Sequence, residues 1–151
     1  MSLWDWASGV YGRPGAEAAF LELQDAHGQC VPFLLWALWA APPPEALRRG
    51  AVIARPWEAA AIEPLRAARR AAKTAFVGVD DTGREALRAA IEANELRAER
   101  LLLEAFEAVH RPTSTARRKP FDLLAAAVKA WGGATVELSV LQKASQPFSG
   151  L

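Results

Sequence analysis

Leu23–Ala40, LQDAHGQCVPFLLWALWA, is the stretch that decides the fold. It places an acid, a histidine and the chain's only cysteine before an apolar run that holds two tryptophans. Three interpretations are open: a catalytic cluster, a membrane segment, or a tight corner that leads into a buried helix. The apolar run from Cys30 to Ala41 is about a dozen residues long, whereas a membrane-spanning helix needs about 20. The run therefore predicts a helix of the protein core.

The residues before this helix favour the corner. Gly28 follows His27 in the way that a glycine follows the end of a helix, in the left-handed cap position. Pro32 lies where proline is tolerated, in the first turn of the next helix. Asp25–Cys30 is thus predicted to be the junction of two helices. The second helix, Phe33–Ala41, is apolar on every side, which predicts that other helices surround it.

Helical patterns extend outward from this corner to both ends of the chain. Ser2 and Asp5 have the spacing of a capping box, which predicts a first helix from Leu3 onward. Apolar spacings of three and four residues, interrupted by proline and glycine, predict the other helices. The expected helices cover about residues 3–11, 16–27, 33–41, 45–53, 55–79, 82–109 and 121–131, with a kink or a fresh start at Pro64.

The longest patterns form a pair in the middle of the chain. The first has an apolar stripe of Leu65, Ala68, Ala72, Phe76 and Val79. After a turn at Asp80-Asp81, Thr82 and Glu85 form the capping box of a long helix. The apolar seam of that helix reads Leu87, Ile91, Asn94, Ala98, Leu101, Ala105 and Val109. The pair predicts an antiparallel hairpin.

These patterns predict an all-α protein, a single compact bundle of roughly six or seven helices with a long central antiparallel hairpin. Residues 1–110 are expected to form the helical core domain and 111–120 a basic linker, with 121–151 a helical extension that packs on or near the core. Residues 135–141 alternate like a strand, but without a partner strand we predict a helix there.

Composition limits the classes of function. Lys and Arg number 18 against 17 Asp and Glu, so no overall field attracts nucleic acid or an anionic membrane. The single cysteine cannot form an internal disulfide, which favours a reducing compartment. The N-terminus, MSLWDWASGVYGRPG, lacks the basic and apolar regions of a secretory signal. We therefore expect a cytoplasmic protein.

The order of several segments resembles that of a known family. Leu3-Trp4-Asp5-Trp6, Tyr11 and Pro14-Gly15 come first, followed by LELQDAHGQCVPFLLWALW, PLRAARRAAK (64–73) and ANELRAER (93–100). Over about residues 3–110 this order resembles a proteobacterial family of small conserved proteins of unknown function. Pro32-Phe33 departs from the family pattern, in which a polar residue followed by Leu is expected. The resemblance implies a soluble all-helical protein and supplies no activity.

Asp25, His27 and Cys30 are the first candidate site. A cysteine near a helix N-terminus with a histidine base is an arrangement of nucleophilic catalysis. Three residues of one short turn rarely converge on one atom, so we interpret Asp25, His27 and Gly28 as a structural junction. In it, Asp25 is expected to bind His27 or free N–H groups of the next helix. No catalytic residue, metal site or cofactor is predicted, because no metal-ligand spacing or phosphate loop occurs.

A basic stripe on the hairpin is the second candidate. Its residues, Arg66, Arg69, Arg70 and Lys73, share one arc of about 100° on a helix. Two arginines of this kind can bind a phosphate or a carboxylate. The alternative is an ion-pair surface, because Glu92, Glu95 and Glu99 form an acidic arc on the next helix.

The tryptophans and Asn94 complete the candidates. Trp4 and Trp6 point in opposed directions on a short helix, so we expect one of them to be exposed and to mark a protein interface. The leading hypothesis is a non-enzymatic protein that binds an unknown protein partner through this tryptophan and the basic stripe; nucleic acid and membranes are not expected partners. The alternative is a site for a small acidic ligand lined by Trp36, Trp39 and Asn94, with an arginine of the stripe as its clamp.

Overall fold

The computed structural model describes residues 1–113 and 118–150, and these residues form helices and connecting loops only. The helices are α1 (Leu3–Tyr11), α2 (Ala16–His27), α3 (Val31–Ala40), α4 (Pro44–Trp57), α5 (Glu63–Ala71), α6 (Asp81–Val109), α7 (Pro120–Trp131) and α8 (Leu138–Ser145). A π-helical turn, η1 (Glu58–Ile62), joins α4 to α5, and a 3₁₀ turn, η2 (Gln146–Phe148), follows α8. The predicted all-α class is confirmed.

The corner around α3 is built as the sequence predicts. Gly28 ends α2 in the left-handed conformation, with φ of 63°, and its N–H donates to the carbonyl of Gln24. Pro32 lies in the first turn of α3. All but two residues of α3, Leu38 and Trp39, are buried, because α1, α2, α4, α6 and α7 all pack against it. The helix that is apolar on every side is therefore the centre of the core.

Aromatic rings fill the core around α3. Trp36 is fully buried and stacks on Phe106 of α6, with ring centroids 4.8 Å apart. Phe33 packs against both of these rings. Gly50 of α4 lies directly on Trp36, since a Cβ atom at that position would come within 2.5 Å of the ring. The absence of a side chain at Gly50 thus allows α4 to approach α3 closely.

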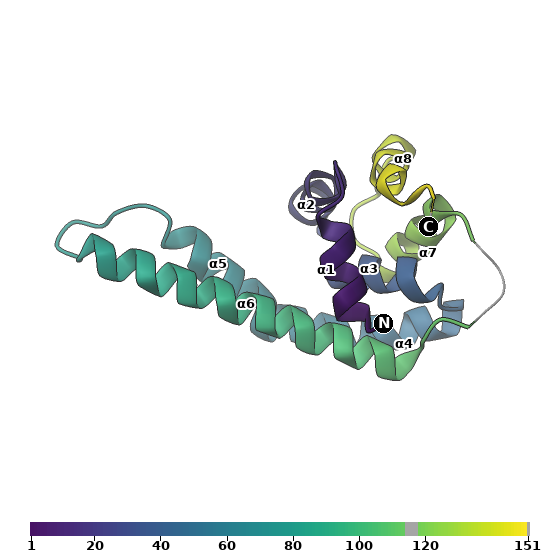
Figure 1. Ribbon diagram of the computed structural model, residues 1–151, viewed down its shortest axis with the longest axis horizontal. Helices are drawn as coiled ribbons and strands as arrows, with labels where there is room; N and C mark the ends of the chain where they lie inside the picture. The colour runs from purple at the N-terminus through teal and green to yellow at the C-terminus, as the bar shows by residue number, and fades with distance from the viewer. Residues whose placement is uncertain (114–117, 151) are drawn as a thin grey trace.

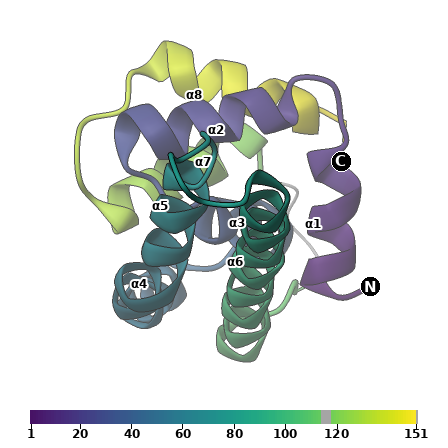
Figure 2. The same ribbon diagram turned by 90° about the vertical axis from the view of Figure 1, so that its left-hand side faces the viewer.

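A long arm projects from this helical body (Figure 1). It consists of α5 and the N-terminal half of α6, which run antiparallel and side by side (Figure 2). The predicted hairpin is thus confirmed. At the tip, Arg84 donates to the carbonyl of Ala72, 2.6 Å away, and so caps the end of α5. The loop beyond it exposes Phe76, Val77 and Val79.

The segment before the arm differs from the prediction. The expected break near Arg55-Pro56 is absent, because α4 continues through Pro56 to Trp57. The π turn, which ends at Ile62, comes instead, and the N–H of Glu63, the residue before Pro64, donates to the carbonyl of Glu58. Proline has no N–H to continue the α-helical ladder, so the chain widens by one residue ahead of it. The π turn is therefore the irregularity that the sequence predicts at Pro64.

The buried face of α6 is not the predicted apolar seam. Leu87, Asn94 and Leu101 are exposed. The buried residues are Arg84, Glu95, Ala98, Leu102, Leu103 and Phe106. At about 100° per residue, this face is turned by roughly 70° from the predicted one. The prediction assumed that only apolar residues face inward, whereas α6 meets α5 largely through paired charges. The predicted apolar stripe of residues 65–79 is also wrong, because α5 ends at Ala71 and Ala68 is exposed.

The C-terminal helices pack onto the body. α7 lies against α3 and α4, and α8 lies against α2 and α7. Phe148 stacks on Trp6, with centroids 6.4 Å apart, and so ties the C-terminal end to α1. Within residues 135–141 the helix begins at Leu138. Of the predicted basic linker, residues 114–117 lie outside the described part of the chain. In the described residues, no helix combines the length and apolar character that crossing a bilayer requires.

Candidate functional site

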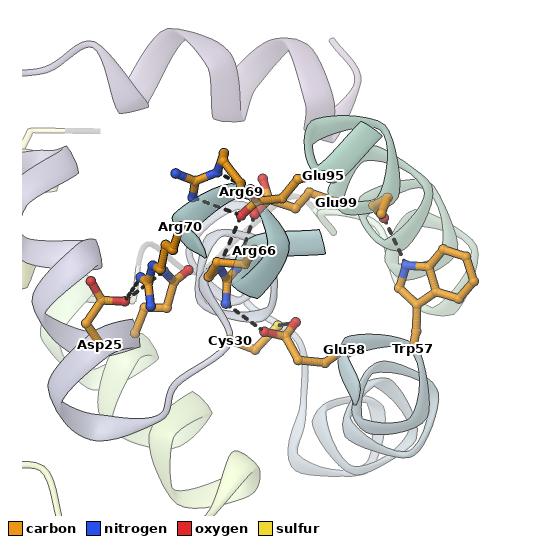
Figure 3. Close-up of polar contacts among 11 residues, drawn as sticks. Asp25, Cys30, Trp57, Glu58, Arg66, Arg69, Arg70, Glu95 and Glu99 are labelled. Carbon is orange, nitrogen blue, oxygen red and sulfur yellow. Dashed lines mark hydrogen bonds and ion pairs between the residues drawn. The ribbon is translucent and has the colours of Figure 1, made fainter. Parts of the chain in front are cut away.

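A buried ionic cluster lies where the arm joins the body (Figure 3). We call it the base cluster; its members are Glu58, Arg66, Arg69, Glu95 and Glu99. Arg66 is at its centre and is only 7% exposed. Its guanidinium nitrogens lie 3.1 Å from Glu95, 3.5 Å from Glu58 and 3.5 Å from Glu99. One arginine thus pairs with three carboxylates.

Three elements bring these side chains together. The π turn carries Glu58 and turns it inward, where it is buried. Arg66 and Arg69 are three residues apart on α5, and Glu95 and Glu99 are four apart on α6, so each pair shares one helix face. Arg69 donates two hydrogen bonds to Glu95. The ion pairs of the cluster therefore join the two helices of the arm, α5 and α6, at its base.

The cluster holds three carboxyl groups against two guanidinium groups. Burial raises the pKa of Glu99 to about 7 although Arg66 lowers it, and Glu95 and Glu58 each add a smaller increase. Burial also raises the pKa of Glu58. Arg66 keeps its charge, because the surrounding carboxylates raise its pKa despite burial. When all three carboxyl groups are ionised, the two guanidinium groups therefore leave one negative charge of the cluster without a matching positive charge.

Cys30 lies beside this cluster without being activated by it. Its thiol is buried, 3.3 Å from a carboxyl oxygen of Glu58. Burial, and then the negative charge of Glu58, raises the pKa of the thiol well above its ordinary value. A reactive cysteine requires the opposite shift. The geometry supports the structural interpretation of this corner.

The partner of Asp25 differs from both predicted partners. Asp25 binds Arg70 of α5, with 2.7 Å between the charged atoms, rather than His27 or N–H groups of α3. Hydrogen bonds from Gln24 and then Arg70 keep the pKa of Asp25 below its ordinary value. The prediction failed because it considered only nearby residues in the sequence, whereas Arg70 comes from α5, 45 residues further along the chain.

The basic stripe divides into two parts in the structure. Arg66 and Arg69 point into the base cluster, while Arg70 and Lys73 are exposed. Glu95 and Glu99 of the acidic arc are their partners, as in the predicted ion-pair alternative, but the contact is buried rather than on the surface. Three of the four cations are thus already paired within the chain, because Arg70 binds Asp25 at the surface.

The tryptophans and Asn94 also lie apart from one another. Trp4 is half-buried beneath Arg100, whose guanidinium carbon is 5.3 Å from the ring centroid, and Trp6 is half-buried on Phe148. The expectation that one of these two tryptophans is exposed is therefore wrong, because both are half-buried. Trp36 is in the core and donates to the carbonyl of His110, and Trp39 is half-buried.

Asn94 is exposed and donates to the carbonyl of Ala90 within its own helix. It therefore lies on the surface, whereas Trp36 is in the core. The predicted acidic-ligand site needs these residues around one cavity, and their positions do not provide it.

Two features escaped the sequence-based prediction. Glu58 stands beside an alanine run, where a glutamate normally faces solvent, yet it is buried at the start of the π turn. The second is a pocket of about 230 Å³ between α1, α3 and α6, which Glu99 and Tyr11 line. The seven-residue spacing of Trp4 and Tyr11 on α1 is the one signal that places them on a shared face.

The comparisons with known proteins identify a family. No curated protein and no solved structure matches the chain. Residues 2–106, more than half of the 151 residues, match the family described as "Protein of unknown function (DUF2390)". The matched range includes the corner, the whole arm and the base cluster. The chain therefore belongs to the DUF2390 family.

Proposed function

We propose that this chain is a cytoplasmic, non-enzymatic binding protein that contacts a protein partner through the tip of its arm. The observation that carries the proposal is the exposure of Phe76, Val77, Val79 and Leu87 at that tip. A group of large apolar side chains at one exposed place often marks a protein interaction site, whereas single exposed apolar residues are common. An arm that holds them away from the body leaves them accessible to another protein.

The base of the arm supports this role by fixing the arm's direction. Arg66 and its three carboxylates join η1, α5 and α6. Trp57 adds a hydrogen bond from its indole N–H to the carbonyl of Ala98, at 2.9 Å. A rigid arm loses little conformational entropy when its tip is bound.

The tip replaces the basic stripe as the proposed interface. Arg66 and Arg69 are engaged in the base cluster, so a partner would have to break buried ion pairs in order to reach them. The apolar tip needs no such rearrangement. This change also agrees with the near balance of charges in the chain, which favours no strongly acidic partner.

The test is affinity capture from a lysate of the source organism, read by mass spectrometry. The wild type is compared with Phe76→Asp/Val77→Asp, which places two charges at the tip. The matched control is Val52→Asp/Leu138→Asp, which places the same charges on two exposed apolar residues of the body. Circular dichroism establishes that all three proteins are folded.

We expect a protein that the wild type and the body variant both capture and that the tip variant loses. Capture of the same proteins by all three forms would contradict the proposal, and so would loss from the body variant alone. If none of the forms captures a protein, the tip has no partner in that lysate and the proposal fails.

A further inference from the structure

We propose that the pocket between α1, α3 and α6 binds a small organic amine, with its ammonium group on the Glu99 carboxylate and its apolar part against the helix walls. This site lies at the base of the arm, away from the tip, and it does not depend on the function proposed above. The class of ligand follows from the shape of the pocket, from its single charged group and from the charge balance behind that group.

The walls of the pocket are mainly apolar. They consist of Trp4, Ala7, Ser8 and Tyr11 from α1, Val31, Pro32 and Leu35 from α3, and Leu96, Glu99 and Leu103 from α6. The hydroxyl of Ser8 already donates to the carbonyl of Trp4. The walls therefore suit an alkyl or aryl group, and Glu99 is the only charged residue among them.

Glu99 is incompletely paired at this position. Among the described residues, Glu99 accepts a hydrogen bond from Arg66 at 3.5 Å, which is the outer limit for such a bond. Its side chain keeps 26% of its exposure and lines the pocket. A carboxylate can accept several hydrogen bonds, so Glu99 has capacity for a donor that enters from the pocket.

The charge balance of the base cluster favours a positively charged hydrogen-bond donor at Glu99. Glu99, Glu58 and Glu95 together face the two guanidinium groups of Arg66 and Arg69, which leaves one negative charge in excess when all are ionised. Burial is the main cause of the raised pKa of Glu99, about 7, and the charges of Glu95 and Glu58 raise it further. An ammonium group would supply the missing positive charge, whereas an acidic ligand would increase the repulsion.

Tyr11 completes the polar end of the pocket. Burial and then the nearby Glu99 raise the pKa of Tyr11 to about 12, so its hydroxyl stays neutral and can hydrogen bond to a ligand. Glu17 and Asp25 contribute further negative potential there, opposed by Arg66. Arg100 covers the ring of Trp4 at the edge of the site. The balance at Tyr11 thus favours a cation.

The size of the pocket limits the ligand. At about 230 Å³ it is smaller than the 300 to 1,000 Å³ of typical drug-sized sites. A ligand of about ten non-hydrogen atoms, such as an arylalkylamine, is therefore the appropriate class. The probes are 2-phenylethylamine, its neutral analogue 2-phenylethanol and the anion phenylacetate.

The test is titration of the full chain with each probe at about pH 8, where Glu99 is ionised, followed by NMR chemical shifts and calorimetry. A charge-assisted hydrogen bond predicts that the amine binds about ten- to a hundredfold more tightly than the alcohol, and that the anion binds least. Equal affinity for amine and alcohol, or absence of amine binding at millimolar concentration, would overturn the proposal.

Two variants locate the binding. Glu99→Gln is expected to reduce amine affinity to that of the alcohol, while Glu92→Gln, an exposed carboxyl on the same helix, should leave it unchanged. Unchanged amine binding by a folded Glu99→Gln protein would refute the assignment. If that variant does not fold, the shifts that the amine induces in the wild type decide, because they must centre on Trp4, Tyr11 and Leu35 rather than elsewhere.

Discussion

Among single residues, Arg66 is expected to have the largest effect on stability. Its guanidinium is shared by the three carboxylates of the base cluster, and all of these groups are largely buried. Removing one partner of a buried ion pair typically costs about 3–5 kcal/mol, because the remaining charge is left without compensation. Arg66→Met should therefore lower the free energy of unfolding by about this amount in urea denaturation. Arg70→Met removes an exposed pair and should cost less than about 1 kcal/mol; equal losses would contradict the prediction.

Glu99 should give the stability a pH dependence. Burial raises its pKa from 4.5 to about 7 in the folded chain. Between these values the folded chain keeps a proton that the unfolded chain has released, so the free energy of unfolding falls as the pH rises. Glu99→Gln should remove up to about 3 kcal/mol of this decrease, while the buried Glu58 leaves a smaller slope of the same sign. Urea titrations from about pH 5 to 8 measure the change of the free energy of unfolding with pH. If Glu99→Gln and Glu92→Gln show the same pH dependence, Glu99 is not its source.

The sequence reveals part of this residue-level picture. The spacing of Arg66 and Arg69, and of Glu95 and Glu99, places opposite charges on the facing sides of two helices, and an ion-pair network follows from it. The burial of the network does not follow, because it depends on where the body covers the base of the arm. Nor does the role of Glu58, which requires a backbone widening that no spacing rule encodes.

At the scale of elements, the contact between α3 and α4 depends on Gly50. A Cβ atom there would come within 2.5 Å of the Trp36 ring, which is itself locked against Phe106. Gly50→Ala should therefore destabilise the protein by about 1–3 kcal/mol through overpacking. Gly9→Ala is the matched control, because its Cβ would meet nothing within 4 Å and alanine favours a helix by roughly 0.5–1 kcal/mol. Thermal unfolding should move the two variants in opposite directions, and a stabilised Gly50→Ala would contradict the packing described.

Elements with explicit end signals could be predicted from the sequence. Ser2 caps α1, Gly28 ends α2 and Pro32 opens α3, each through a local backbone requirement. The orientation of α6 could not be predicted from its apolar residues. In a two-helix arm that is exposed on most sides, paired charges form the contact and leucines such as Leu87 and Leu101 remain outside it. The apolar character of a helix is informative where a core surrounds it, as around α3, whereas the apolar pattern of α6 is misleading because no core surrounds the arm.

At the scale of the whole molecule, the body and the arm should differ in local stability. The C-terminal part of α6 packs on α1, α3 and α4 and buries Leu102, Leu103 and Phe106, whereas Arg84 is the one buried residue among residues 81–90. Regions with few buried apolar contacts open with a lower free energy than the core. Hydrogen exchange should therefore be fast at residues 81–90, slower near Glu95 and slowest around Phe106. Arg66→Met should extend fast exchange toward Ala98 while leaving the amides of α3 protected. Uniform protection along α6 would instead mean that the arm and the body unfold as one unit, and the arm would then derive its rigidity from the whole fold rather than from the base cluster.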